Sequence, residues 1–394
     1  MSSNRQLLKI IENFSEETEA VMATVVKVEG TAYRQLGTRM LILPNSQSVG
    51  GNLGGCLEAE VCKKAVWLTR EDKAVVRRYS SGEKKPFSQD MYHQIDEDID
   101  QDGARSFGLG CHGMVSVLFE RLNSTRVSSV VELLNKVSVS HYGGGMAVII
   151  NAQKEASIRV GDRLIHHPEE EQPFWIGQGQ VDEGLDQQIH RDLKFSMNIK
   201  KSMHRVYATG SGTVEVFFEF IAPPHRLVIF GAGLDVVPLV ALAKQQGWHV
   251  TVVDSRAHFA RPANFPQADV VLCHSIYQPE RLAARLEGAA TVIMTHSLVH
   301  DRQWLQYLLE EPPAYIGQLG PRERTENLLK EIQTYAQHSI QFTMGRSVLH
   351  YPIGVTLGGD TMEVTALSIL ADITAAMNQR DVMLTHQEFF IHAI

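Results

Sequence analysis

Apolar residues in the second half of the chain recur in short continuous runs, and amphipathic segments lie between them. The runs predict strands at 226–230, 250–253, 269–273, 291–294 and 314–316. Continuous apolar strands that alternate with helices are typical of a parallel sheet covered on both faces. The pattern therefore predicts a doubly wound α/β domain.

The first half has a different pattern, in which β-branched segments are joined by tight, glycine-containing turns. The expected strands are 21–28, 40–43, 114–120, 146–152, 157–160, 163–166, 204–208 and 214–221, and the expected helices are 4–19, 57–70 and 128–136. Strands joined by such turns favour antiparallel hairpins. We expect an N-terminal α+β domain over 1–222 and the α/β domain over 225–394. Pro223-Pro224 marks the boundary, because proline ends strands and stiffens linkers.

Composition narrows the class of protein. At roughly 150 residues a domain, 394 residues predict two or three domains. An apolar fraction of 44% and a charged fraction of 21% are ordinary for a folded globular chain. The chain has 37 basic and 45 acidic residues, and the resulting net charge of -8 argues against nucleic acid as a main partner.

Neither a signal peptide nor a membrane span is expected. The first residues have the pattern of an amphipathic helix rather than an apolar signal core. The longest apolar stretch, 227–243, contains Asp235 and Pro238 and is shorter than a bilayer-spanning helix. Four cysteines do not form a disulfide framework in a chain of this length. We therefore expect reduced thiols and a cytoplasmic location.

A glycine-containing loop follows the first strand of the second half. Gly231 and Gly233 precede a helix, and Asp254 closes the next strand. In a dinucleotide-binding fold such glycines let backbone N–H groups approach a pyrophosphate, and the acid binds a ribose hydroxyl. Val236 stands at the third glycine position. The loop predicts a Rossmann-like domain and leaves two interpretations open: NAD(P) as ligand, or a retained scaffold with an altered pocket.

A second glycine-rich loop carries a cysteine. Gly54 and Gly55 precede Cys56 at the start of an expected helix, and Glu58 lies within the same turn. The positive end of a helix lowers a thiol pKa, and the thiolate is the form that binds metal or attacks sulfur. Glu58 is a candidate acid–base group. The alternative is a buried structural cysteine at a tight turn.

Cys111 repeats this arrangement, because glycines surround it just before an expected strand. The two loops suggest two thiols facing one site. Cys62, in mid-helix, and Cys273, in a parallel strand, are expected to be packing residues. No spacing among the four cysteines matches a zinc site.

Two further groups are candidates for ligand contacts. Arg34 and Arg39 flank a glycine turn, and paired arginines can bind a phosphate bidentately, although solvated surface arginines are the alternative. His296 and His300 are four residues apart, with Asp301 beside them. That spacing suits a metal on a helix face, but the glutamate of a zinc-hydrolase motif is missing, so packing and ligand contact remain equal alternatives.

Taken in order, these segments resemble the xanthine dehydrogenase accessory family, XdhC/CoxI. The matching motifs are at 30–34, 37–40, 50–58, 110–113, 230–233, 252–256, 294–296, 315–320, 352–354, 363 and 368–372. They cover both ends of the chain, whereas the segment at about 125–200 matches little.

The resemblance implies a protein that binds the molybdenum cofactor (molybdopterin), supports its sulfuration and delivers it to a xanthine dehydrogenase-type molybdenum hydroxylase. It also implies a homodimer, a cysteine desulfurase partner, and a binding protein rather than a turnover enzyme. Cys56 would be the metal ligand and, with Glu58, the reactive pair. The cofactor-binding residues would be Arg34, Arg39, Gly54, Gly55, Cys111, Gly231, Gly233, Asp254 and His296.

The alternative function is an NAD(P)-dependent oxidoreductase that uses Gly231, Gly233 and Asp254. The cysteine loops favour the first function, since hydride transfer needs no thiols. A catalytic molybdenum hydroxylase subunit is disfavoured, because four cysteines cannot ligate the two iron–sulfur clusters of such enzymes.

Overall fold

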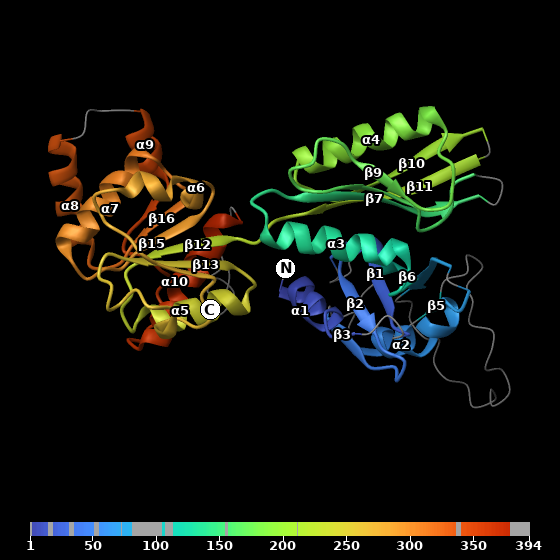
Figure 1. The fold of residues 1–394 in the computed structure, drawn as a ribbon, viewed down its shortest axis with the longest axis horizontal. Coiled ribbons are helices and arrows are strands. Elements are labelled where there is room, and N and C mark those ends of the chain that lie inside the picture. The colour runs from blue at the N-terminus through green and yellow to red at the C-terminus, as the bar shows by residue number, and fades with distance from the viewer. Residues whose placement is uncertain are drawn as a thin grey trace, which may run out of the picture. The chain divides into compact units, whose positions relative to one another are not determined.

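The computed structural model divides the chain into two compact units, Met1–Pro223 and Pro224–Ile394 (Figure 1). The residues that it describes are 2–14, 19–30, 35–50, 55–71, 73–80, 105–106, 113–153, 157–210, 212–335 and 340–378. Among these residues, no helix combines the length and the apolar composition needed to cross a bilayer.

The first unit is built on two mixed or antiparallel sheets. The first sheet has the order β3-β2-β1-β6-β4-β5. Its strands are β1 (Val21–Gly30), β2 (Arg39–Ile42), β3 (Ser48–Gly50), β4 (Val75–Ser80), β5 (Arg105–Ser106) and β6 (Gly113–Arg121). The second sheet has the order β10-β11-β7-β8-β9. Its strands are β7 (Gly144–Ala152), β8 (Arg163–His166), β9 (Phe174–Ile176), β10 (Met203–Thr209) and β11 (Gly212–Ile221).

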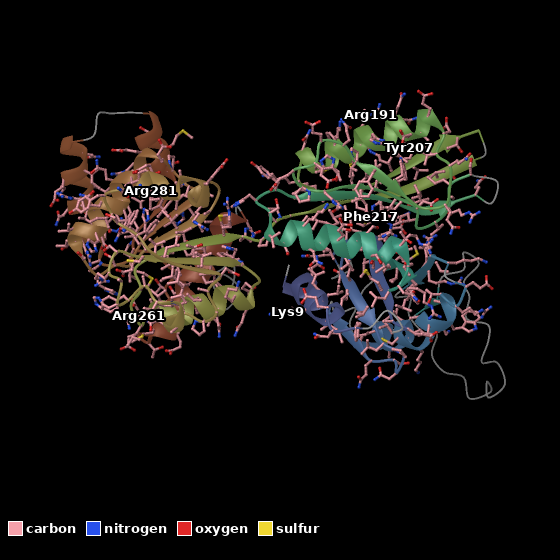
Figure 2. The ribbon with its side chains drawn as sticks, in the orientation of Figure 1. Lys9, Arg191, Tyr207, Phe217, Arg261 and Arg281 are labelled. Carbon is pink, nitrogen blue, oxygen red and sulfur yellow. The ribbon has the colours of Figure 1, made fainter. Side chains whose placement is uncertain are left out.

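Helices cover these sheets in layers. The helices are α1 (Ser2–Ile11), α2 (Gly55–Leu68), α3 (Thr125–Val139) and α4 (Glu183–Asn198). α2 packs on one face of the first sheet and α4 on one face of the second, while α1 and α3 share a core with residues of both sheets. Tyr207 faces α4, where its hydroxyl donates to Asp192 over 2.7 Å, and Phe217 faces the first sheet (Figure 2).

Two buried ion pairs join the sheets. Arg39 of β2 donates from Nη1 and Nη2 to the Glu219 carboxylate of β11, over 2.8 and 2.5 Å, and the Arg39 side chain is 1% exposed. Arg163 of β8 donates to Glu120 of β6. A charge buried without its partner is strongly unfavourable, so these pairs fix the sheets against each other.

The second unit contains one parallel sheet with the order β14-β13-β12-β15-β16-β17. Its strands are β12 (Arg226–Phe230), β13 (His249–Asp254), β14 (Val270–Cys273), β15 (Ala290–Ile293), β16 (Tyr315–Gln318) and β17 (Leu349–His350). Numbered within the unit, this is the 3-2-1-4-5-6 order of a Rossmann fold. The predicted fold class, a Rossmann-like C-terminal half after an N-terminal α+β half, is confirmed.

Helices cover both faces of this parallel sheet. α5 (Val236–Gln245) and α10 (Met362–Met377) share one apolar core with the sheet. α6 (Ala283–Leu286), α7 (Leu298–Glu310) and α8 (Arg322–Tyr335) pack on the other face, and α9 (Ile340–Ser347) packs against α7. Short 3₁₀ turns occupy Pro262–Asn264 and Pro279–Leu282.

Three local predictions are wrong, and helix α4 was missed. The first helix ends at Ile11, and residues 157–160 form no strand, because the Asp162 carboxylate accepts the backbone N–H of Arg159 over 2.9 Å and closes a turn. Cys273 is exposed at the end of edge strand β14, not packed, whereas Cys62 is buried as expected. Helix α4 was not expected, although Asp182 caps it and its buried residues recur at helical spacing.

We predict that the two units fold independently when the chain is cut at Pro223-Pro224. Each unit has its own apolar cores, and independent domains normally unfold cooperatively by themselves. Thermal melts of residues 1–223 and 224–394, followed by circular dichroism, should each show one sigmoidal transition. A non-cooperative melt of the second unit would show that it needs the first.

Candidate functional site

The first candidate site lies where the strand order of the second unit reverses, between β12 and β15. Ligands of open α/β sheets bind in the crevice outside the carboxyl ends of such strands. Gly231 follows β12 with φ +124°, and a Cβ atom there would lie 2.3 Å from the Met294 carbonyl oxygen. Only glycine lets the two loops pass this closely. The third glycine position holds Val236, which is buried in the core as the first residue of α5.

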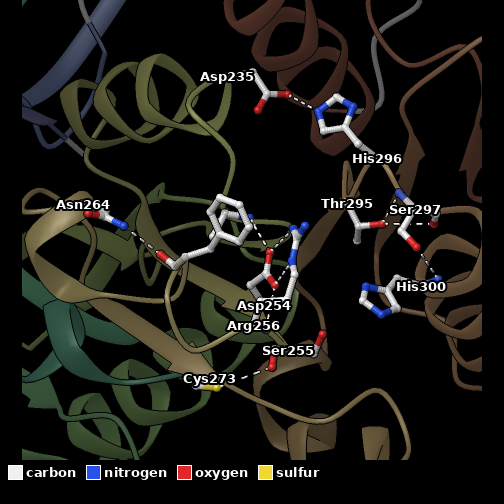
Figure 3. Close-up of polar contacts among 12 residues, drawn as sticks. Asp235, Asp254, Ser255, Arg256, Asn264, Cys273, Thr295, His296, Ser297 and His300 are labelled. Atoms are coloured by element: carbon white, nitrogen blue, oxygen red, sulfur yellow. Dashed lines mark hydrogen bonds and ion pairs between the residues drawn. The ribbon is translucent and has the colours of Figure 1, made fainter.

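Asp254, at the end of β13, is already engaged by its own chain. Its carboxylate accepts the Ala232 N–H over 3.0 Å and the Arg256 Nε and Nη2 over 2.9 and 2.8 Å (Figure 3). Burial by itself raises the pKa of Asp254, but the hydrogen bonds from Arg256 and Ala232 together hold this pKa below its usual value. The Arg256 guanidinium lies over the Phe259 ring, 4.2 Å from its centroid. Arg256 thus occupies the carboxylate that would bind a ribose hydroxyl.

His296 joins the two loops at the crevice. Its Nε2 lies 2.8 Å from Asp235 Oδ2, at the start of α5 (Figure 3). His296 has φ +58°, a left-handed conformation that is uncommon outside glycine and clusters at functional sites. The ring is exposed. His296 is therefore a positioned, solvent-accessible side chain at the switch point.

A buried polar network lies next to His296. Asp301 of α7 is 1% exposed, and Thr295 Oγ1 donates to its Oδ1 over 2.5 Å. Gln318 Nε2 and Arg324 Nη2 donate to its Oδ2 over 3.1 and 2.5 Å. Sequence reasoning missed Gln318 and Arg324, because Gln318 ends β16, Arg324 lies in α8, and both meet Asp301 only in the folded unit. The polar residues at the carboxyl ends of β15 and β16 were the available signal.

This network borders a groove between α7 and α8. The groove has a volume of about 580 Å³. Its basic lining residues are His296, Arg302 and Arg324, and its apolar ones are Leu298, Val299 and Leu328. A groove of this size accommodates a nucleotide-sized molecule.

The second candidate site is the cysteine loop of the first unit. Helix α2 begins at Gly55, so Cys56 occupies its first turn, where the helix dipole favours a thiolate. The Cys56 side chain lies outside the described residues, as do Arg34, Gly54 and Cys111. Their predicted roles stay predictions.

Glu58 is half-buried, and its Oε1 accepts a hydrogen bond from the Ser48 hydroxyl of β3. Burial raises the pKa of the Cys62 thiol, which lies one turn further along α2. The hydrogen bond between Ser48 and the Glu58 carboxylate thus links α2 to β3 of the first sheet.

Arg39 is not available to a phosphate, which corrects the expectation from the glycine turn. Its guanidinium is buried against Glu219 and also donates to the Gly37 carbonyl over 3.0 Å. Gly37 has φ +79°, and a Cβ atom there would meet Glu219 Oε1 at 2.4 Å. The glycine turn therefore accommodates an internal ion pair.

No cluster of three histidine, cysteine or acidic side chains suitable for a metal occurs in the described parts of the chain. His296 and His300 do not form a pair on one helix, since His296 precedes α7 and bonds Asp235.

Comparison with models of known protein families shows to which family the chain belongs. The XdhC and CoxI family model matches residues 14–80, and the XdhC Rossmann domain model matches residues 227–373. Together they cover more than half of the chain, in the order expected from its motifs. The chain belongs to the XdhC/CoxI family. Its matched spans contain both candidate sites, except for Cys111.

One relative of this XdhC/CoxI protein extends over nearly the whole chain and a second over less than half of it. A Bacillus subtilis (strain 168) protein described as a probable xanthine dehydrogenase subunit is 26% identical over 361 residues, covering 91% of this chain and 93% of that protein. The "Uncharacterized protein YqeB" of Escherichia coli (strain K12) is 26% identical over 171 residues, covering 42% of this chain and 30% of that protein.

A crystal structure described as a xanthine dehydrogenase from Bacillus halodurans superposes with a TM-score of 0.69 at 24% identity. The superposition covers 99% of each chain, which supports the fold of each part of this XdhC/CoxI protein.

Proposed function

We propose that this protein is a maturation factor for a xanthine dehydrogenase-type molybdoenzyme. In this proposal it binds the molybdenum cofactor as cargo, supports its sulfuration and delivers it to the client enzyme. The observation that carries the proposal is the match of both family models, one to each unit. The Bacillus subtilis relative, whose name refers to a xanthine dehydrogenase, supports the choice of client.

The proposed molybdenum ligand is Cys56. Its place in the first turn of α2 favours the thiolate, and soft sulfur donors suit such a metal. Cys111 and Arg34 are proposed to contact the same cargo, with Gly54 and Gly55 leaving space beside the thiol. We assign Glu58 a positioning role through Ser48.

Partners follow from the same proposal. Sulfuration needs a sulfur donor, for which a cysteine desulfurase is the proposed source. We place the protein in the cytoplasm as a homodimer. The proposed role is that of a cofactor carrier, not of a turnover enzyme.

The experiment that tests the proposal is expression in a host supplied with molybdate, followed by measurement of molybdenum and pterin in the purified protein. We expect both to copurify with the protein, and we expect the loaded protein to activate a cofactor-free xanthine dehydrogenase. Metal-free, pterin-free protein that does not raise client activity would contradict the proposal.

An NAD(P)-dependent oxidoreductase remains the second candidate, because the strand order and Gly231 are those of a dinucleotide-binding fold. The Asp254–Arg256 pair argues against this function, since the ribose-binding carboxylate is occupied.

We predict that millimolar NAD(H) leaves the melting temperature unchanged. A ligand at 100 times its dissociation constant stabilises a fold by about 2.7 kcal/mol, which is readily seen by differential scanning fluorimetry. Arg256→Ala, which frees the carboxylate, is the matched variant. A clear stabilisation of the parent protein by NAD(H) would favour the oxidoreductase.

A further inference from the structure

The groove between α7 and α8 has features that the proposed function does not use. α7 contributes Arg302 to it and α8 contributes Arg324, and His296, just before α7, also lines it. Three basic side chains and one acidic side chain, Glu331, thus line one groove.

Arg324 is fixed in place by a buried carboxylate. Its Nη2 donates to Asp301, which Thr295 and Gln318 also hold. Asp301 is the one hydrogen-bond partner of this guanidinium among the described residues, and the buried Arg324 Nε has none. A guanidinium has five N–H donors, and a planar fork of this kind matches a phosphate. Arg324 is therefore a pre-oriented anion-binding group with donors to offer.

Arg302 is held much more loosely. Its only ion-pair partner among the described residues is Glu331, at 3.6 Å, and both side chains are solvent-exposed to a considerable extent. Exposed ion pairs of this kind contribute little to the stability of the fold. A ligand anion can therefore replace Glu331 as the partner of Arg302 without a large loss of stability. Arg302 can turn toward the groove that it lines.

The other lining residues are the polar Asn327 and Glu331, the latter being the ion-pair partner of Arg302, and three apolar side chains. Leu298 and Val299 are 58% and 55% exposed, and Leu328 is buried beside them. Exposed apolar side chains next to arginines suit a ligand that has a flat ring and a charged end.

We propose that this groove binds a phosphate monoester carried on a planar heterocycle, with the phosphate on Arg302 and Arg324 and the ring against Leu298 and Val299. Nucleoside monophosphates and phosphorylated pterins share this chemistry. The proposed cargo is itself a phosphorylated pterin, so the pterin source rests on the function proposed above, whereas the nucleotide source does not.

The test is isothermal titration calorimetry on the full-length protein, with inorganic phosphate, AMP, GMP, CMP and neopterin monophosphate as probes. We expect at least one ring-bearing monoester to bind more tightly than inorganic phosphate and than its unphosphorylated parent compound. The preferred ring distinguishes a nucleotide from a pterin. Arg302→Gln should weaken binding about tenfold, because a hydrogen bond to a charged group is lost.

The matched control is Arg281→Gln, which removes the same charge from an exposed site of the same unit (Figure 2). It should leave binding unchanged. Arg324→Gln should abolish binding, but it also strips Asp301 of its cationic partner, so its melting temperature must be measured in parallel. If Arg324→Gln unfolds, Arg302→Gln still tests the proposal.

The proposal is overturned if none of the monoesters binds, or if Arg302→Gln and Arg281→Gln bind them as well as the parent does. The titration contains neither molybdenum nor a client enzyme. If no monoester binds in this titration, the proposed maturation role is not contradicted. If molybdenum and pterin do not copurify with the protein, the proposed groove site is not contradicted.

Discussion

Replacing Cys56 by serine is expected to remove cofactor retention and client activation while the fold stays intact. Serine is nearly isosteric and can still accept N–H groups at the start of α2, but it supplies no soft, easily ionised sulfur. Molybdenum and pterin content should fall at least about tenfold, because even the loss of a residue that only supports a metal ligand lowers metal affinity by about that factor. Elemental analysis, pterin fluorescence and reconstitution of a client dehydrogenase measure this loss.

Cys62→Ser is the matched control, because the two cysteines share one helix. Cys62 packs among apolar side chains, and burial raises the pKa of its thiol, which keeps it unreactive. This variant should lose about 1–3 kcal/mol of stability from burying a hydroxyl and should keep its cofactor. If Cys56→Ser holds molybdenum and pterin as well as the parent does, the thiolate mechanism is wrong.

The largest loss of stability is expected for Glu219→Gln. The change leaves Arg39 buried without its carboxylate partner, and breaking such a pair costs about 3–5 kcal/mol. Urea denaturation should show a lower midpoint with an unchanged slope.

Glu71→Gln is the control for this experiment, since it breaks an exposed ion pair with Lys73 in the same unit. Its midpoint should not move measurably. A Glu219→Gln protein as stable as Glu71→Gln would mean that the Arg39–Glu219 pair does not hold the two sheets together.

The parallel sheet was predictable because its inner strands β12, β13 and β15 are buried on both faces, so each of them is a largely apolar run. The N-terminal half was harder. Arg39 and Glu219 are 180 residues apart, and nothing local shows that a charged residue on a short strand will be buried against a distant one. Arg39 in isolation therefore suggested a phosphate-binding residue.

The candidate site of the second unit shows the same limit. Gly231 and Asp254 are visible in the sequence because their spacing is local, but the spacing does not reveal that Arg256 occupies the carboxylate. Asp301, Gln318 and Arg324 meet from three segments, so only the fold brings them together.

The pairing of α5 with α10 affects how the chain folds during synthesis. Apolar faces of α5, near residue 240, and of α10, near residue 370, complete one core. When the ribosome has made α5, its partner helix is still more than a hundred codons away. The first unit is by then fully synthesised and can fold, since domains generally fold as units from the N-terminus. The Rossmann unit instead keeps an uncovered apolar helix face until α10 has been synthesised, and this interval is when the nascent protein most needs protection from aggregation.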